Sequence, residues 1–152
     1  GDVYKRQVDN YIYILNVRFS GEIHFEKKVD ESLLGVHIPS MLLQPIVENS
    51  VNYGIRNIDW EGRIVLSVYR EEEKVCISIK DNGVGMTEER IAQVMQNCIS
   101  HQEDTGDSNG VGLNNVMERL HLFFDGAEEF VMMSEGPGRG TEVVIRIPYL
   151  KM

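Results

Sequence analysis

The sequence is short of cysteine, of basic residues and of long apolar runs, and each shortage excludes a class of protein. The spacing of its two cysteines, Cys76 and Cys98, fits neither a disulfide framework nor a zinc site, which favours a reducing compartment. The longest apolar run, Tyr11 to Leu15, is far shorter than the roughly 20 residues of a membrane-spanning helix. No secretory signal opens the chain.

Basic residues are outnumbered, because 15 Lys and Arg against 24 Asp and Glu give a net charge of −9. Such a surface repels nucleic-acid phosphates and anionic lipid, so we expect no nucleic acid and no membrane as a direct partner. An anionic ligand would need a metal cation or oriented backbone N–H groups beside it.

A length of 152 residues is typical of one soluble domain. The first residue is Gly1 rather than Met, so we expect a piece of a longer protein. Residues 1–7 are expected to be a disordered or artificial leader, and residues 8–152 to form the domain.

Apolar residues recur at helical spacing in some segments and alternate in others. Helices are predicted over Val8–Phe19, after Pro39 (with Pro45 near the first turn), after Thr87 and from Gly112. Strands are predicted over Glu22–Val29, Gly62–Arg70, Lys74–Lys80, Glu128–Ser134 and Thr141–Ile147. This mixture predicts a two-layer α/β (α+β) sandwich, in which helices cover one face of a mixed, mostly antiparallel sheet.

Residues 97–110 break all periodicity and are rich in Ser, Asp, Gly and Asn. A structureless loop of this length in a compact domain is usually functional. We expect a lid that is poorly ordered without its ligand, because few large apolar side chains oppose its conformational entropy.

Three glycine clusters fall between predicted elements, at Asp81–Gly85, Gly110–Gly112 and Gly138–Thr141. Singly, each fits an ordinary turn with a positive φ, and none fits the phosphate-binding loop or the dinucleotide fingerprint. A fourth motif precedes them, Leu42-Leu43-Gln44-Pro45-Ile46-Val47-Glu48-Asn49. In this order the four motifs resemble the Bergerat-type ATP-binding fold of gyrase, heat-shock chaperones, mismatch-repair ATPases and histidine kinases.

The closer resemblance is to sensor histidine kinases of the LytS/YesM type, and it covers residues 8–150. The further residues that carry it are Gly110-Val111-Gly112-Leu113-x-Asn115-Val116-x-x-Arg119-Leu120 and the leading Tyr11-Ile12-x-Ile14 … Arg18-Phe19. The resemblance implies the ATP-binding catalytic domain of a protein-histidine kinase. Such a domain uses ATP and Mg²⁺ and passes the γ-phosphoryl group to a histidine, for relay to a cognate response regulator.

The resemblance also implies a role for each motif residue. Asn49 would bind Mg²⁺ through its amide oxygen, a hard ligand, and Asp81 would accept a hydrogen bond from the adenine amine. The phosphates would lie at the N-terminus of the helix that Gly110 and Gly112 begin. The expected ATP contacts are Asn49, Tyr53, Asp81, Gly83, Gly85, Met86, Gly110, Val111, Gly112, Leu113 and Thr141. Tyr53 also fits a plain core tyrosine.

Three departures from the family pattern bear on activity. Asn52 stands where many relatives carry a Lys that contacts phosphate, and residues 97–110 contain no Lys or Arg. We therefore expect modest affinity for ATP. Pro45 stands where the hydrolysing members have a water-activating Glu, so hydrolysis to water is expected to be slow.

None of the four histidines lies in an Asn-Pro-His-Phe motif. His24 is expected on a surface strand and His121 on the polar side of a helix, while His37 and His101 fall in connections. We therefore expect the phosphoacceptor on an upstream dimerisation segment of the same protein, with a homodimer only in the intact protein. The domain itself is expected on the cytoplasmic side of a membrane-anchored sensor, and inactive without that segment.

Two other functions remain open. A serine kinase of the anti-sigma-factor kind shares the glycine clusters, although the Asn115-x-x-x-Arg119-Leu120 pattern argues against it. A degenerate domain that binds nucleotide without catalysis is consistent with Asn52 and the acidic loop, but the intact Asn49 and Asp81 argue against it.

Overall fold

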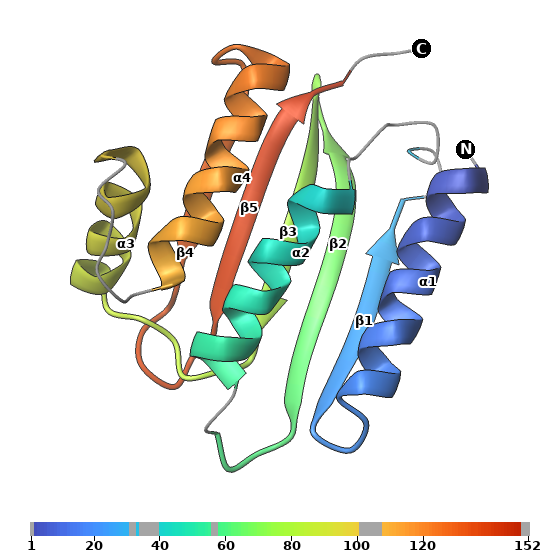
Figure 1. Cartoon of the computed structure of the whole chain (residues 1–152), viewed down its shortest axis with the longest axis vertical. Coiled ribbons are helices and arrows are strands. Elements are labelled where there is room, and N and C mark those ends of the chain that lie inside the picture. Colours follow the sequence, from blue (N-terminus) through green and yellow to red (C-terminus); the bar gives the residue numbers. More distant parts are fainter. Residues whose placement is uncertain (1, 31–32, 34–39, 56–57, 101–107, 150–152) are drawn as a thin grey trace.

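The computed structural model describes residues 2–30, 33, 40–55, 58–100 and 108–149. The helical elements are α1 (Asp2–Arg18), α2 (Ser40–Asn49), the π-helix η2 (Ser50–Ile55), α3 (Glu88–Ser100) and α4 (Ser108–Phe124). The strands are β1 (Ile23–Val29), β2 (Gly62–Glu71), β3 (Lys74–Asp81), β4 (Glu129–Met133) and β5 (Thr141–Pro148). Figure 1 shows their arrangement.

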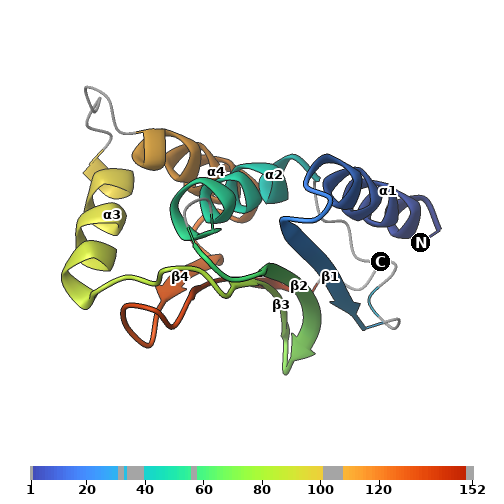
Figure 2. The same cartoon turned by 90° about the horizontal axis from the view of Figure 1, so that it is seen from below.

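The strands of the described chain form one sheet in the order β1-β2-β3-β5-β4. β1 runs parallel to β2, and the other neighbouring pairs are antiparallel. α1, α2 and α4 lie over one face of this sheet (Figure 2). The predicted fold, two layers with a mixed and mostly antiparallel sheet, is therefore confirmed. None of the helices in the described ranges has the length and apolar character needed to span a membrane.

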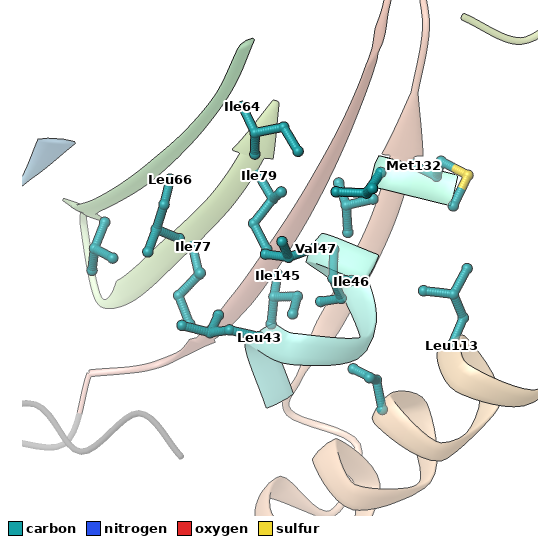
Figure 3. Close-up of a cluster of buried hydrophobic side chains, with 14 of the residues drawn as sticks. Leu43, Ile46, Val47, Ile64, Leu66, Ile77, Ile79, Leu113, Met132 and Ile145 are labelled. Atoms are coloured by element: carbon teal, nitrogen blue, oxygen red, sulfur yellow. The ribbon is translucent and has the colours of Figure 1, made fainter. Parts of the chain in front are cut away.

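Apolar and polar side chains alternate along the central hairpin of β2 and β3, and this alternation determines which face of the sheet is buried. Leu66 of β2 pairs with Ile79 of β3, and Val68 pairs with Ile77, so four apolar side chains point to the same face. Ile46 of α2, with 0% of its surface exposed, packs in the same core (Figure 3). Full burial of such a side chain contributes about 1.5–3 kcal/mol. The core therefore fixes α2 directly over the middle of the sheet.

Several element boundaries differ from the prediction. α1 begins at Asp2 rather than Val8, so the helix includes residues 2–7. α3 continues to Ser100 and α4 already begins at Ser108, so the predicted loop 97–110 is too long at both ends. The loop is predicted because apolar residues stop recurring at helical spacing. A helix can continue without such an apolar stripe, as the ends of α3 and α4 do here. The remaining part of the expected lid, residues 101–107, lies outside the described residues.

Pro45 lies inside α2 rather than in its first turn. Proline has no N–H to donate to the carbonyl group four residues earlier, which weakens a helix at that point. The helix nevertheless continues, and at Ser50 it passes directly into the π-helix η2. Short π-helical segments are frequent at functional sites, which directs attention to the end of α2.

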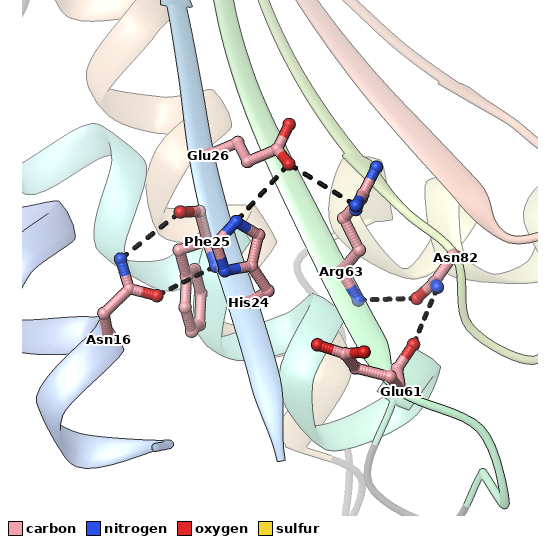
Figure 4. Close-up of polar contacts among 7 residues, drawn as sticks. All are labelled: Asn16, His24, Phe25, Glu26, Glu61, Arg63 and Asn82. Atoms are coloured by element: carbon pink, nitrogen blue, oxygen red, sulfur yellow. Dashed lines mark hydrogen bonds and ion pairs between the residues drawn. The ribbon is translucent and has the colours of Figure 1, made fainter. Parts of the chain in front are cut away.

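The side chain of Asn16 joins α1 to the edge strand β1. Its Nδ2 donates a hydrogen bond to the Phe25 carbonyl at 3.3 Å, and its Oδ1 accepts one from the Phe25 N–H at 3.0 Å (Figure 4). Because β1 has a strand neighbour on one side only, these bonds satisfy backbone groups at the free edge of the sheet. The Phe19 ring, 5.8 Å from the Phe25 ring, extends the same contact.

Candidate nucleotide site

Asp81, the last residue of β3, is the only buried carboxylate in the described part of the chain, with 4% of its surface exposed. Its Oδ1 accepts hydrogen bonds from the backbone N–H groups of Gly83 at 2.9 Å and Thr141 at 3.2 Å. The side chain of Ser50 also hydrogen-bonds to the carboxyl group. The end of β3, the start of β5 and the start of η2 therefore meet at one side chain.

Burial raises the pKa of the Asp81 carboxyl above its ordinary value of 3.8. Hydrogen bonds from Gly83, Thr141 and Ser50 act in the opposite direction, but the loss of hydration has the larger effect. A buried carboxylate with a shifted pKa, surrounded by converging polar groups, is a recognised sign of a functional site. Such a carboxylate is suited to accept a hydrogen bond from a ligand.

Two glycines allow the end of β3, the start of β5 and η2 to approach closely. A Cβ atom on Gly83 would lie 2.1 Å from the carbonyl oxygen of Gly54 in η2, and one on Gly140 would lie 2.1 Å from the carbonyl oxygen of Asp81. The Gly54 oxygen instead accepts a hydrogen bond from the Val84 N–H at 2.8 Å. Close backbone packing therefore explains glycine at these positions of the first and third clusters.

Ser134 joins the first glycine cluster to the third. Its hydroxyl accepts a hydrogen bond from the Met86 N–H at 3.0 Å and donates one to the Gly140 carbonyl at 2.6 Å. Gly85 has a φ of 73°, and a Cβ atom there would lie 2.2 Å from the Gly136 carbonyl oxygen. The structure thus brings together Gly83, Gly85, Met86 and Thr141, as the motifs predict.

Asn49 ends α2 immediately before Ser50, the residue that hydrogen-bonds to Asp81. It is half-buried, as is Tyr53, whereas Asn52 is exposed and lines a groove on the α1 side of α2. Asn49 and Asp81 therefore lie at the same end of the domain. Asn52, three residues after Asn49, is exposed to solvent.

The second glycine cluster lies inside α4 rather than at its start. Since α4 begins at Ser108, the N–H groups of the helix without an intrahelical acceptor are those of residues 108–110. The expectation that Gly112 begins the helix is therefore wrong, and its N–H falls within the intrahelical hydrogen-bond pattern. Of the predicted phosphate contacts in this cluster, Gly110 keeps a free N–H group in the first turn. The Leu113 side chain, with 0% exposure, belongs to the core.

A metal site made of protein side chains alone is not found in the described part of the chain, where no three His, Cys, Asp or Glu residues gather. The histidines there also lie at the surface, as expected. The side chain of His24 is 51% exposed, with its Nε2 3.4 Å from Glu26 (Figure 4), and His121 is exposed on α4. His37 and His101 lie outside the described residues.

Sequence reasoning missed Ser50, Gly54 and Ser134. Their contacts join segments that are remote in the sequence, which composition and periodicity do not reveal. Gly54 offers one usable signal, because a glycine within a helical segment often marks a close approach of another backbone.

Comparison with known proteins identifies the family. Residues 39–151 match the family described as "Histidine kinase-, DNA gyrase B-, and HSP90-like ATPase". The sensor protein LytS of Oceanobacillus iheyensis is 30% identical over 139 residues, which cover 91% of this chain and 23% of that protein. The sensor histidine kinase YesM of Bacillus subtilis is 32% identical over 141 residues, covering 93% of this chain and 22% of that protein.

Solved structures share the fold. A mycobacterial sensor histidine kinase, MprB, superimposes with a TM-score of 0.65 at 19% identity, over 98% of this chain and 96% of that one. Full-length ShkA in complex with AMPPNP gives a TM-score of 0.65 at 19% identity, over 97% of this chain and 29% of that one.

The chain belongs to the histidine kinase-, DNA gyrase B- and HSP90-like ATPase family. The expectations of this family, and of an ATP-binding catalytic domain of the sensor histidine kinase type, are confirmed. The chain spans about a quarter of the length of the curated relatives it matches (23% of LytS).

Proposed function

We propose that this domain binds ATP and transfers the γ-phosphoryl group to a histidine in an upstream dimerisation segment of its own protein, for relay to a response regulator. The buried carboxylate of Asp81 carries the proposal. Both backbone hydrogen bonds fall on Oδ1, so Oδ2 keeps acceptor capacity for an exocyclic amine such as that of adenine. A carboxylate is kept at 4% exposure here without a cationic partner in the described part of the chain, as expected of a recognition group.

The other motif residues complete the nucleotide site in this proposal. Gly83 and Gly85 let the backbone approach the base, with Met86 and Thr141 beside it. Tyr53 lies against the nucleoside. The N–H group of Gly110 faces the phosphates at the N-terminus of α4, whose dipole favours negative charge, with the backbone of Val111, Gly112 and Leu113 following it.

Asn49 is the protein ligand that we propose for Mg²⁺. A single amide oxygen fits this ion, because Mg²⁺ commonly keeps several waters and takes its other ligands from substrate phosphates. The absence of a cluster of three acidic or metal-binding side chains in the described ranges agrees with such a shared site. When bound, Mg²⁺ would neutralise charge on the phosphates.

The protein's own contribution to transfer is positioning. Asn49 and Asp81 hold the two ends of the nucleotide, so that the γ-phosphorus faces the incoming imidazole in line with the bond that breaks. The bond from the γ-phosphorus to the bridging oxygen of ADP breaks as the bond to the imidazole nitrogen forms. Pro45 supplies no general base for water at the corresponding position, which keeps the phosphoryl group for the histidine.

The intact protein and the isolated domain give the decisive test, using ATP labelled on its γ-phosphate. The intact protein should gain acid-labile, base-stable phosphate, and the domain alone should gain none. Asn49→Asp should reduce this labelling, while Asn10→Asp, the same change at an exposed position of α1, should leave it intact. Acid-stable phosphate on a partner's serine would support the serine kinase instead, and nucleotide binding without any labelling would support a binding-only domain.

The remaining partners follow from the same proposal. We place the domain in the cytoplasm as part of a membrane-anchored sensor, with a cognate response regulator as the final acceptor. Dimerisation would come from the upstream segment, so the intact protein should be a homodimer in sedimentation equilibrium.

A further inference from the structure

A groove of about 1220 Å³ runs between α1 and the α2–η2 segment, over the start of β1. It is larger than the ~300–1,000 Å³ of pockets for small molecules, which favours a protein segment as its occupant. Buried residues of the core, among them Leu15, Val47 and Ile55, contribute apolar lining. Neither Asn49 nor Asp81 lines it, so the groove is separate from the nucleotide site. Figure 1 shows α1 and α2 on either side of this position.

Among the described residues, the rim of this groove carries more negative than positive charge. Its described lining includes the carboxylates of Glu22, Glu48, Asp59 and Glu61 but the guanidinium group of Arg18 alone. Within the described ranges, none of these four carboxylates forms an ion pair. Burial raises the pKa of Tyr11, in the same lining, to about 12, and Glu48 adds to the rise. Arg18 acts in the opposite direction on Tyr11.

Two large apolar side chains that line the same groove are exposed to solvent. Ile14 of α1 is 60% exposed and Trp60 is 44% exposed. Apolar surface rimmed by polar groups is typical of interaction sites, and tryptophan is enriched in them. An apolar floor with a charged rim is the arrangement that receives one face of an amphipathic helix.

We infer that this groove binds a cationic amphipathic helix of a protein partner, with the apolar face of the helix on Ile14 and Trp60 and its Lys or Arg side chains on the carboxylate rim. Charge complementarity selects this occupant. Anionic lipid and nucleic acid are repelled by the same carboxylates, and a second copy of the chain carries a net charge of −9 itself.

Trp60 reports directly on the groove, because it is the only tryptophan in the chain. Its emission would be followed while three synthetic peptides are added: an amphipathic Leu/Lys helix, a Leu/Glu helix of the same pattern, and a scrambled Leu/Lys peptide without an apolar face. Only the first should give a saturable shift. Salt should weaken it, because the screening length falls from about 10 Å at 0.1 M to about 3 Å at 1 M.

Variants locate the binding surface. Glu22→Lys, Glu61→Lys and Ile14→Asp change exposed side chains and should each weaken binding of the Leu/Lys helix several-fold, with unchanged circular dichroism. Glu89→Lys, an equal charge reversal on α3, should leave it unchanged, and so should Asp81→Asn in the nucleotide site. Equal loss with Glu89→Lys, or equal binding of the Leu/Glu helix, would overturn the inference. So would concentration-dependent dimers that are abolished by Ile14→Asp, because a second copy would then occupy the groove.

Discussion

The two carboxylate oxygens of Asp81 have different surroundings, and this asymmetry decides how a substitution there acts. Oδ1 is held by the N–H groups of Gly83 and Thr141 at 2.9 and 3.2 Å. An asparagine can present its own amide oxygen to both donors and place its NH₂ group at the position of Oδ2. The fold should therefore survive while one acceptor of the site becomes a donor.

Asp81→Asn should weaken ATP and ADP binding by roughly 1.5–3 kcal/mol, the usual contribution of a hydrogen bond to a charged group. Isothermal calorimetry on the isolated domain measures this, and Asp59→Asn, the same change at an exposed site, is the control. Parental affinity in the Asp81→Asn variant would show that Asp81 does not contact the base.

The raised pKa of Asp81 links stability to pH. Because burial raises the pKa in the folded state above 3.8, the associated stabilisation is present below that pH and is lost as the pH rises through the raised value. Asp81→Asn removes this loss. The variant should therefore gain stability relative to the parent from acidic to neutral pH. In urea unfolding, the difference between its free energy of unfolding and that of the parent should increase over this range. A difference that does not change with pH would contradict the assigned shift.

Among the elements, the contact between η2 and the turn after β3 leaves no room for a side chain at Gly83. Gly83→Ala would place a Cβ atom 2.1 Å from the Gly54 carbonyl oxygen, with backbone on both sides of the clash. We expect a loss of roughly 1–3 kcal/mol of stability, the range for overpacked sites, and weaker nucleotide binding. Gly126→Ala is the control: its Cβ atom meets nothing within 4 Å, so any strain from its positive φ of 91° should leave nucleotide binding unchanged.

The Asn16 side chain makes a second prediction about an element, the docking of α1. Asn16→Ala leaves the Phe25 N–H and carbonyl without their partner, at roughly 1–3 kcal/mol for unsatisfied groups that are partly buried. Denaturant unfolding should show this loss, and hydrogen exchange of the Phe25 amide should accelerate. Asn10→Ala, at an exposed position of α1, should change neither. Unchanged exchange at Phe25 would mean that this contact does not hold the edge strand.

The sequence predicts the elements whose apolar side chains alternate or recur at regular spacing. It does not predict the features that are set by tertiary packing. The strands around Leu66 and Ile79 were predicted with their buried faces, since burial imposes period two directly. The position of Pro45 inside α2 and the π-helix after Ser50 were not, because tertiary packing overrides the local preference for a helix end. The position of Asn49 beside the Asp81 turn followed from the family motifs rather than from periodicity.

On the scale of the whole molecule, the net charge of −9 opposes a nucleotide polyphosphate. Binding of ATP should therefore depend strongly on Mg²⁺, which offsets phosphate charge next to Asn49. Calorimetry with and without a chelator tests this, and adenosine, which has no phosphates, is the control. ATP affinity should fall on chelation while adenosine affinity stays constant. An equal response of the two ligands would argue against a metal bridge to the phosphates.

β2 meets its two neighbours by routes of unequal length, and this sets an order of folding. β3 follows β2 through a tight turn in which Glu72 has a φ of 57°, whereas β1 reaches β2 only after the chain has passed through α2 and η2. Closing a longer loop costs more chain entropy, and parallel pairs form slowly. The hairpin that carries Asp81 is therefore expected to form early, and β1 to dock late together with α1. A folding intermediate stalled before that step would have the hairpin without the groove between α1 and α2.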